Sequence, residues 1–163
     1  MQIIRDRAVV EDEWRHINDE PGDALPEGKI IVSLARWEAE KESLMSRKNS
    51  GLGIRLEPDE RANDIAEDIE YFQVIAVNFP VFRDGRGFST ARLLRERFGY
   101  AGELRAVGDV LRDQIFYMYR CGFDAFEVRA DRDINAALNA FDEFSVKYQP
   151  AGDEKLPLWR RRS

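Results

Sequence analysis

The stretch Val74-Ile75-Ala76-Val77-Asn78-Phe79 decides the fold of this 163-residue chain, because it is almost entirely apolar. Such a strand is typical of a parallel sheet whose two faces are both covered. Other strand-like stretches recur every twenty to thirty residues, at 29–34, 52–56, 103–107 and 125–129. A helical pattern follows each of them. The sequence therefore predicts an α/β fold, a mostly parallel sheet built from successive βα units joined by right-handed crossovers.

Helical spacing of apolar residues, with Gly, Asn or Pro at the boundaries, predicts the helices. They are expected at 35–48, 59–72, 90–98, 110–121 and 131–144. An N-terminal β-hairpin is predicted from residues 3–5 and 8–10. Strand order cannot be read from the pattern, so a doubly wound sheet and a partial barrel both stay open. Residues 1–149 are interpreted as a single α/β domain, and 150–163 as a C-terminal tail.

The composition is that of a globular protein, with 44% apolar and 34% charged residues. No apolar run approaches the roughly 20 residues that a membrane helix needs, and the N-terminus shows no signal sequence. A cytoplasmic location is therefore expected. The single cysteine, Cys121, excludes an internal disulfide and a four-cysteine cluster, and we expect it to be buried. The single histidine, His16, lies in an acidic stretch and is predicted to be an ordinary surface residue.

Charge is unevenly distributed along the chain, whose formal net charge is −6. Residues 1–82 carry 10 basic and 18 acidic side chains, a net of −8. Residues 83–132 carry 10 and 8, a net of +2, and all ten basic residues there are arginines. Arginine makes forked bonds to oxyanions and carboxylates that lysine cannot copy. Because the whole chain is acidic and has no basic stripe with interleaved aromatics, binding to nucleic acid is not expected.

Ligands of parallel α/β sheets bind beyond the carboxyl ends of the strands. This rule selects the loops that follow the third, fourth and fifth predicted strands, where glycines let the backbone approach a ligand and arginines supply cationic forks. The anion-binding candidates in these loops are Arg83, Gly85, Arg86, Gly87, Ser89, Arg112 and Arg129. Ser89 is expected at a helix N-terminus, where free N–H groups favour anions. These residues together predict a site for a small oxyanion or a phosphate.

A structural interpretation of the same residues stays open. The glycines would then form only a tight turn, and the arginines would lie on solvated helix faces, paired with Glu96, Asp109 and Asp113. Asp84 and Asp109 are the candidate catalytic residues, because two carboxylates that converge can act as general acid and base. The alternative role for Asp109 is to cap the following helix.

No cofactor is evident in the sequence, and no metal site is predicted. The glycine spacing at residues 85–87 matches neither a Walker loop nor a dinucleotide fingerprint. A lone cysteine cannot shuttle two electrons as an internal disulfide. These features disfavour an autonomous redox enzyme.

Several long phrases resemble a bacterial family of unknown function that is labelled as an oxidoreductase of sulfite reduction. The phrases are FPVFRDGRGFS (79–89), ARLLR (91–95), GELRAVGDVLRDQ (102–114) and RCGFDAF (120–126). The resemblance covers residues 30–149 and is strongest at 75–127. It implies a cytoplasmic role in sulfate assimilation toward cysteine. It implies no catalytic residues, since none are established for the family.

Two hypotheses of function follow. The first is an accessory protein of assimilatory sulfite reduction, which binds a small oxyanion, or docks on sulfite reductase or another sulfate-assimilation enzyme, through the arginine-rich rim. The second is an enzyme that acts on a small anionic substrate, such as a sulfur oxyanion or a phosphorylated compound, with aspartate as acid/base and arginines as clamps. The aromatic run at 116–119 is expected to pack in a helix, and its exposed members could line the interface of a homo-oligomer.

Overall fold

The computed structural model describes residues 1–17, 24–80, 85–129 and 131–147, with only the backbone described at 140 and 142–147. Its eight-stranded sheet has the strand order β2-β1-β8-β7-β6-β5-β4-β3 and confirms the predicted α/β class. The strands are β1 (Gln2–Arg5), β2 (Ala8–Glu11), β3 (Arg15–His16), β4 (Ile30–Ser33), β5 (Leu52–Leu56), β6 (Val74–Phe79), β7 (Glu103–Gly108) and β8 (Ala125–Phe126).

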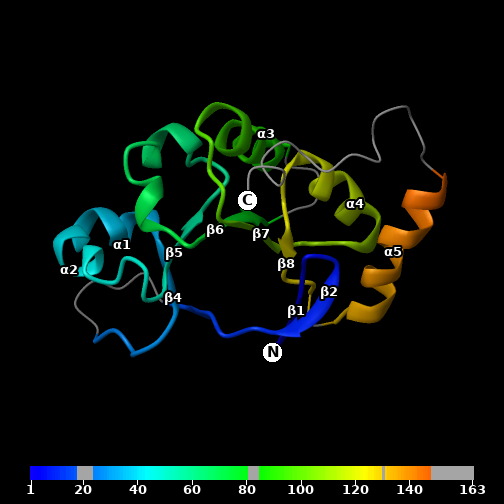
Figure 1. Ribbon diagram of the computed structural model, residues 1–163, viewed down its shortest axis with the longest axis horizontal. Helices are drawn as coiled ribbons and strands as arrows, with labels where there is room; N and C mark the ends of the chain where they lie inside the picture. Colours follow the sequence, from blue (N-terminus) through cyan, green and yellow to red (C-terminus); the bar gives the residue numbers. More distant parts are fainter. Residues whose placement is uncertain (18–23, 81–84, 130, 148–163) are drawn as a thin grey trace.

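Helices cover the outer face of the curled sheet (Figure 1). They are α1 (Leu34–Ala39), α2 (Lys41–Met45), α3 (Arg86–Arg92), α4 (Arg112–Cys121), α5 (Ile134–Lys147), the 3₁₀ turns η1 (Ala62–Ile65) and η2 (Ile69–Tyr71), and the π-helix η3 (Leu93–Arg97). Within the described ranges, none of them combines the length and the hydropathy needed to cross a bilayer.

The sheet is parallel from β3 to β8, and only β1 runs against this direction, since it pairs antiparallel with both β8 and β2. β1 and β2 form the predicted hairpin, in which Ile4 lies opposite Val9. Its two turn residues, Asp6 and Arg7, have φ angles of 52° and 65°. This left-handed pair is the geometry that a two-residue hairpin requires, because it matches the twist of the strands.

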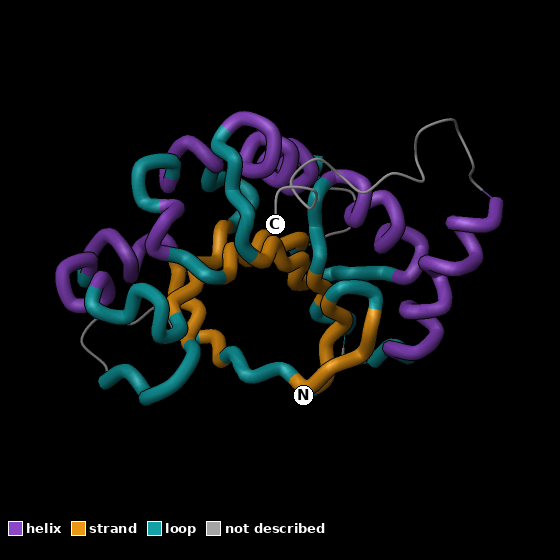
Figure 2. Tube along the Cα trace, in the orientation of Figure 1, coloured by secondary structure: helices purple, strands orange, loops and turns teal. Residues whose placement is uncertain are grey.

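Strand order selects the partial barrel over the doubly wound sheet. Strands β3 to β8 follow one another in chain order, with no reversal at which helices would change face. The sheet's two edge strands, β2 and β3, are also consecutive in the chain. Residues 12–14, here named the crossing segment, must therefore bridge the open side of the half-barrel, as Figure 2 shows.

Both faces of β6 are covered, as its apolar sequence predicted. Its helix-facing residues belong to the main core, whereas Val74 and Ala76 face the concave side. There they pack with Ile31 and Val107, and Trp14 of the crossing segment lies against them. The crossing segment is also held by the Glu13 carboxylate, which accepts a hydrogen bond from Lys29 Nζ at 2.6 Å. Apolar side chains and the crossing segment therefore fill part of the concave side of the half-barrel.

Some predicted elements are wrong in detail. The helix at 59–72 is absent, and the turns η1 and η2 take its place. Acidic side chains there bond to nearby backbone N–H groups, Glu60 to that of Glu57 and Asp64 to that of Arg61, and such local bonds compete with a regular helix.

Other helix boundaries also differ from the prediction. The helix at 35–48 is broken at Glu40, whose φ is −123°. The helix expected from residue 90 already begins at Arg86. The last helix, expected from residue 131, begins at Ile134, and Asp133 accepts a hydrogen bond from the backbone N–H of Asn135.

Candidate functional site

The carboxyl ends of β6, β7 and β8 meet at one edge of the sheet. The backbone N–H of Asp109 donates to the carbonyl of Phe79 at 2.6 Å. The Arg129 guanidinium, which follows β8, donates to the Asp109 carboxylate at 2.8 Å. We call Phe79, Gly108, Asp109 and Arg129 the carboxyl-end rim. The predicted site residues Arg83 and Asp84 lie outside the described residues, so their contribution to this rim stays a prediction.

Gly108 is required where β7 reaches the rim. Its φ is +92°, a conformation that side chains rarely adopt. A Cβ atom built there would collide with Oδ1 of Asn78 and lie 2.6 Å from the carbonyl oxygen of Phe79. The absence of a side chain therefore lets β6 and β7 approach closely at the rim.

Arg129 is held by carboxylates on two sides. Besides Asp109, it bonds both oxygens of Asp131, at 2.9 and 3.1 Å. The hydrogen bonds with Asp109 and then with Asp131 raise the pKa of Arg129. Asp109 is therefore an ion-pair partner, and the predicted helix cap is wrong: the residue preceding α4 is Leu111, with no side-chain cap.

Three predicted anion-binding residues lie around the start of α3. Gly85 immediately precedes the helix, and Gly87 packs directly against the Phe79 ring. Ser89 is the fourth residue of α3 and is exposed, so its predicted place at the N-terminus of the helix is wrong.

The two remaining predicted arginines occupy the first positions of helices. Arg86 is the exposed first residue of α3. Arg112 is the first residue of α4 and donates to the carbonyl of Ala136 in α5 at 3.2 Å. Its guanidinium also lies 3.8 Å from the carboxylate of Asp113, the kind of pairing that the structural interpretation expects. Among the described candidates, direct contacts join Arg129 to Asp109, and anion binding at the rim stays a prediction.

Asp109→Asn tests whether the rim pair is structural. Arg129 is 41% exposed in this pair, and exposed ion pairs contribute little to stability. The free energy of unfolding, measured by urea denaturation, is therefore expected to stay close to that of the wild type. A larger loss would show that Asp109 has a structural role beyond this pair.

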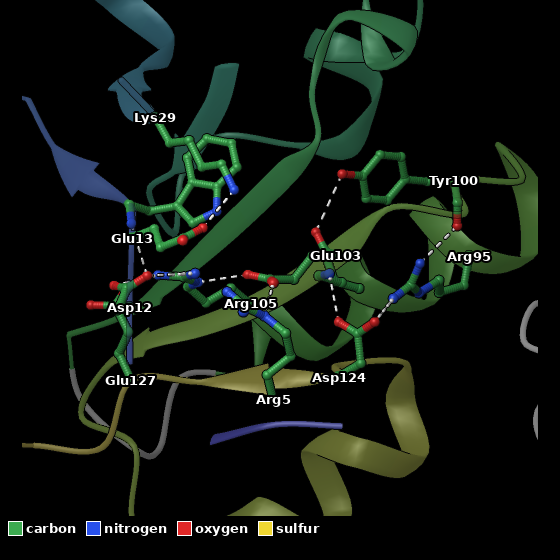
Figure 3. Close-up of polar contacts among 12 residues, drawn as sticks. Arg5, Asp12, Glu13, Lys29, Arg95, Tyr100, Glu103, Arg105, Asp124 and Glu127 are labelled. Atoms are coloured by element: carbon green, nitrogen blue, oxygen red, sulfur yellow. Dashed lines mark hydrogen bonds and ion pairs between the residues drawn. The ribbon is translucent and has the colours of Figure 1, made fainter. Parts of the chain in front are cut away.

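A second polar cluster, which the sequence analysis missed, lies on the concave face. Its centre is Arg105 of β7, whose side chain is fully buried. The guanidinium makes two bonds to Asp12 of the crossing segment, at 2.9 and 3.1 Å, and reaches Glu103 at 2.8 Å and Glu127 at 2.9 Å. Figure 3 shows Arg105 among these carboxylates. Burial alone would lower the pKa of Arg105, but Glu103, Asp12 and Glu127 raise it overall.

Hydrogen bonds extend this cluster across the sheet. Arg5 of β1 reaches Glu103 at 2.6 Å. His16 Nε2 lies 2.8 Å from Glu127, and His16 Nδ1 lies 3.3 Å from Nη1 of Arg55 on β5. Arg55 also bonds Glu57, which accepts a hydrogen bond from Asn78. We call the whole set the concave-face network: Arg5, Asp12, His16, Arg55, Glu57, Asn78, Glu103, Arg105 and Glu127.

His16 is exposed, as predicted, but its ring nitrogens also join it to the concave-face network. It lies on β3, an edge strand too short to give a pattern, and its bond to Glu127 joins residues 111 positions apart. One local signal did exist, since Glu103 and Arg105 alternate with apolar residues along β7. A period of two is typical of a strand with one polar face.

Arg95, which is also buried among the described arginines of residues 83–132, has a structural role. It donates to the carbonyls of Tyr100, Gly102 and Gly122 at 2.7–3.0 Å, and its guanidinium lies 3.4 Å from Asp124. Burial raises the pKa of Tyr100, whose hydroxyl donates to the Phe72 carbonyl. These bonds fix the end of η3 against the amino edge of the sheet, away from the carboxyl-end rim.

Comparison with known protein families finds a match to the sequence. Residues 53–159, about two thirds of the chain, match the model of a family described as bacterial protein of unknown function (DUF934). No curated protein sequence matches the chain. In the described part of the chain, no group of three or more histidine, cysteine, aspartate or glutamate side chains could hold a metal ion.

Proposed function

We propose that this chain, which belongs to the DUF934 family of bacterial proteins, is a cytoplasmic accessory protein of assimilatory sulfite reduction that docks on sulfite reductase or another sulfate-assimilation enzyme. The resemblance of residues 79–126 to proteins labelled for sulfite reduction supports the process. The contacts at the carboxyl-end rim support docking over capture of a small oxyanion there. Arg129 already has carboxylates on both sides, so a free oxyanion would compete with tethered aspartates.

The observation that carries the proposal is the exposed aromatic surface beside the rim. Tyr117 of α4 is 48% exposed and is one of two exposed large hydrophobic side chains among the described residues. Its ring contacts Phe88 of α3 at 4.9 Å, and Phe88 contacts Phe79 at the end of β6. Tyrosine and arginine are enriched in the energetic centres of protein interfaces. Phe79, whose carbonyl accepts a hydrogen bond from Asp109, links these two rings to the rim that carries Arg129, so the surface has this composition.

Capture from native extract tests the docking proposal. We expect the wild-type chain to co-purify with sulfite reductase or another sulfate-assimilation enzyme, and the double variant Tyr117→Ser/Arg129→Glu to bind that enzyme at least about tenfold more weakly. Surface substitutions of this kind change stability little, so the fold should survive. Activity of the captured enzyme with and without the chain is the second readout.

Arg97→Glu is the matched control. It reverses an exposed arginine at the end of η3, near the amino edge of the sheet, and should leave capture unchanged. Equal capture by the wild type and the double variant, or recovery of only a second copy of this chain, would contradict docking through this surface.

A further inference from the structure

We infer that a cavity at the end of β3 binds a small organic anion, that is, a carboxylate or a phosphate ester with an apolar body. The cavity lies at the β3–β4 end of the half-barrel, whereas the docking surface of Tyr117, Phe88 and Arg129 lies around β6 to β8. Binding in the cavity is therefore independent of docking through that surface.

The cavity has a volume of about 440 Å³ and is open to solvent. Three parts of the chain border it, namely residues 15–17 at the end of β3, the segment at 24–26, and Arg36 of α1. Because β3 runs parallel to β4, the cavity lies at the edge of the sheet where the carboxyl ends of the parallel strands are found. Ligands of parallel α/β sheets bind at this edge. The volume is also typical of small-molecule sites.

Arg15 supplies a guanidinium that a ligand can reach. Its side chain is exposed and, within the part of the chain that the structure describes, has no hydrogen-bond or ion-pair partner. Its backbone is fixed, because its N–H donates to the carbonyl of Lys29 at 3.0 Å. Arg129 of the carboxyl-end rim differs in being held by two aspartates. The Arg15 guanidinium can therefore bind a carboxylate or a phosphate through two parallel hydrogen bonds.

Arg36 adds a second positive charge in the wall of the cavity. Its side chain is 1% exposed, so solvent ions screen its charge less than that of an exposed arginine. Its Nε donates to the carboxylate of Glu40 at 2.6 Å, which holds the guanidinium in place, and Glu40 itself does not border the cavity. Among the described residues on the border, none is acidic. The charge of this border therefore favours an anion.

The remaining described residues on the border are mostly apolar and favour a ligand with an apolar body. Besides His16, they are Ile17, Ala24, Leu25 and Pro26. Ile17 and Leu25 also pack against the main core. Arg47, which follows α2, donates to the carbonyl of Pro26 at 2.8 Å and so fixes the segment at 24–26. An inorganic oxyanion would use only the arginines, whereas an organic anion would also bury apolar surface against these walls.

Calorimetric titration of the full chain with benzoate and with phenyl phosphate tests the inference. We expect saturable binding of at least one of these anions, at one site per chain. Benzyl alcohol, which lacks the charge, and inorganic phosphate, which lacks the ring, should each bind at least about tenfold more weakly. The backbone amide NMR signals of Ile17, Ala24 and Leu25 should shift with the same dissociation constant, which would place the anion in this cavity.

Two variants at exposed positions test the border directly. Arg15→Gln removes the guanidinium that the ligand reaches, and Ala24→Asp adds a carboxylate beside it. Each should weaken binding of the better anion at least about tenfold. Both side chains are exposed, so the fold should survive the substitutions.

Arg97→Gln, which changes an exposed arginine far from the cavity, is the matched control and should bind like the wild type. The docking variant Tyr117→Ser/Arg129→Glu should also keep wild-type affinity, which separates this site from the docking surface. Three results would each overturn the inference: equal affinity for benzyl alcohol, undiminished binding in both border variants, or no saturable binding of either anion below about 10 mM.

Discussion

Arg105→Met is expected to lower the free energy of unfolding by about 3–5 kcal/mol, the range found when one partner of a buried ion pair is removed. The Arg105 side chain is fully buried, and Asp12, Glu103 and Glu127 surround it. Without the guanidinium, these carboxylates face one another in a site that water reaches poorly. Urea denaturation at neutral pH measures the loss.

The pH dependence of this loss has a defined sign. In the wild type the folded-state pKa of Glu127 is lowered, so its stabilising contribution is present above the ordinary value of 4.5 and disappears as the pH falls through the folded-state value. In the variant, acid instead neutralises carboxylates that repel one another. The stability difference between the two proteins should therefore narrow from pH 7 toward roughly pH 4.

Two further variants control this prediction. Arg105→Lys keeps the charge but not the planar fork, so it should recover only part of the stability. Arg129→Met removes an exposed arginine and should change the free energy of unfolding little. A loss at Arg105 as small as that at Arg129, or a difference that widens in acid, would contradict a central structural role for Arg105.

The parallel sheet was predictable from sequence because its signals are local. Val74–Phe79 is apolar on both faces, and each strand is followed by a helix at regular spacing. The choice of a partial barrel was not predictable, since it depends on which strands pair. The short edge strand that carries His16 has only two residues, and a strand of that length has no periodicity.

The candidate site was predictable only in part, because some of its contacts depend on which distant strands lie side by side. The rule that ligands bind at carboxyl ends correctly brought the loops of Asp109 and Arg129 together. The concave-face network instead joins side chains that are distant in sequence, such as Arg105 and Asp12, 93 residues apart. From the sequence alone, an arginine in a strand is expected to face solvent. The contact with the crossing segment, which buries Arg105, is visible only in the structure.

Gly108→Ala is expected to destabilise the protein through two separate effects. The φ of +92° costs roughly 1–3 kcal/mol once a Cβ is present. The new methyl group must also displace Asn78 or the Phe79 carbonyl, and such crowding costs about 1–3 kcal/mol more. The free energy of unfolding, measured by urea denaturation, should therefore fall by more than it does for the same substitution at a glycine that has a positive φ but open space where its Cβ would lie.

Gly99→Ala supplies that comparison. Its φ is +67°, but no atom lies within 4 Å of the position where its Cβ would be. The difference between the two variants therefore measures the crowding at the end of β7 and should be at least about 1 kcal/mol. Because Asn78 donates to Glu57, displacement of Asn78 should also disturb the neighbouring Arg55–His16 contact. The nitrogen NMR signals of the His16 ring should then shift in Gly108→Ala and keep their positions in Gly99→Ala. Equal losses of stability in the two variants, with unshifted signals in both, would show that β6 and β7 do not need the close approach.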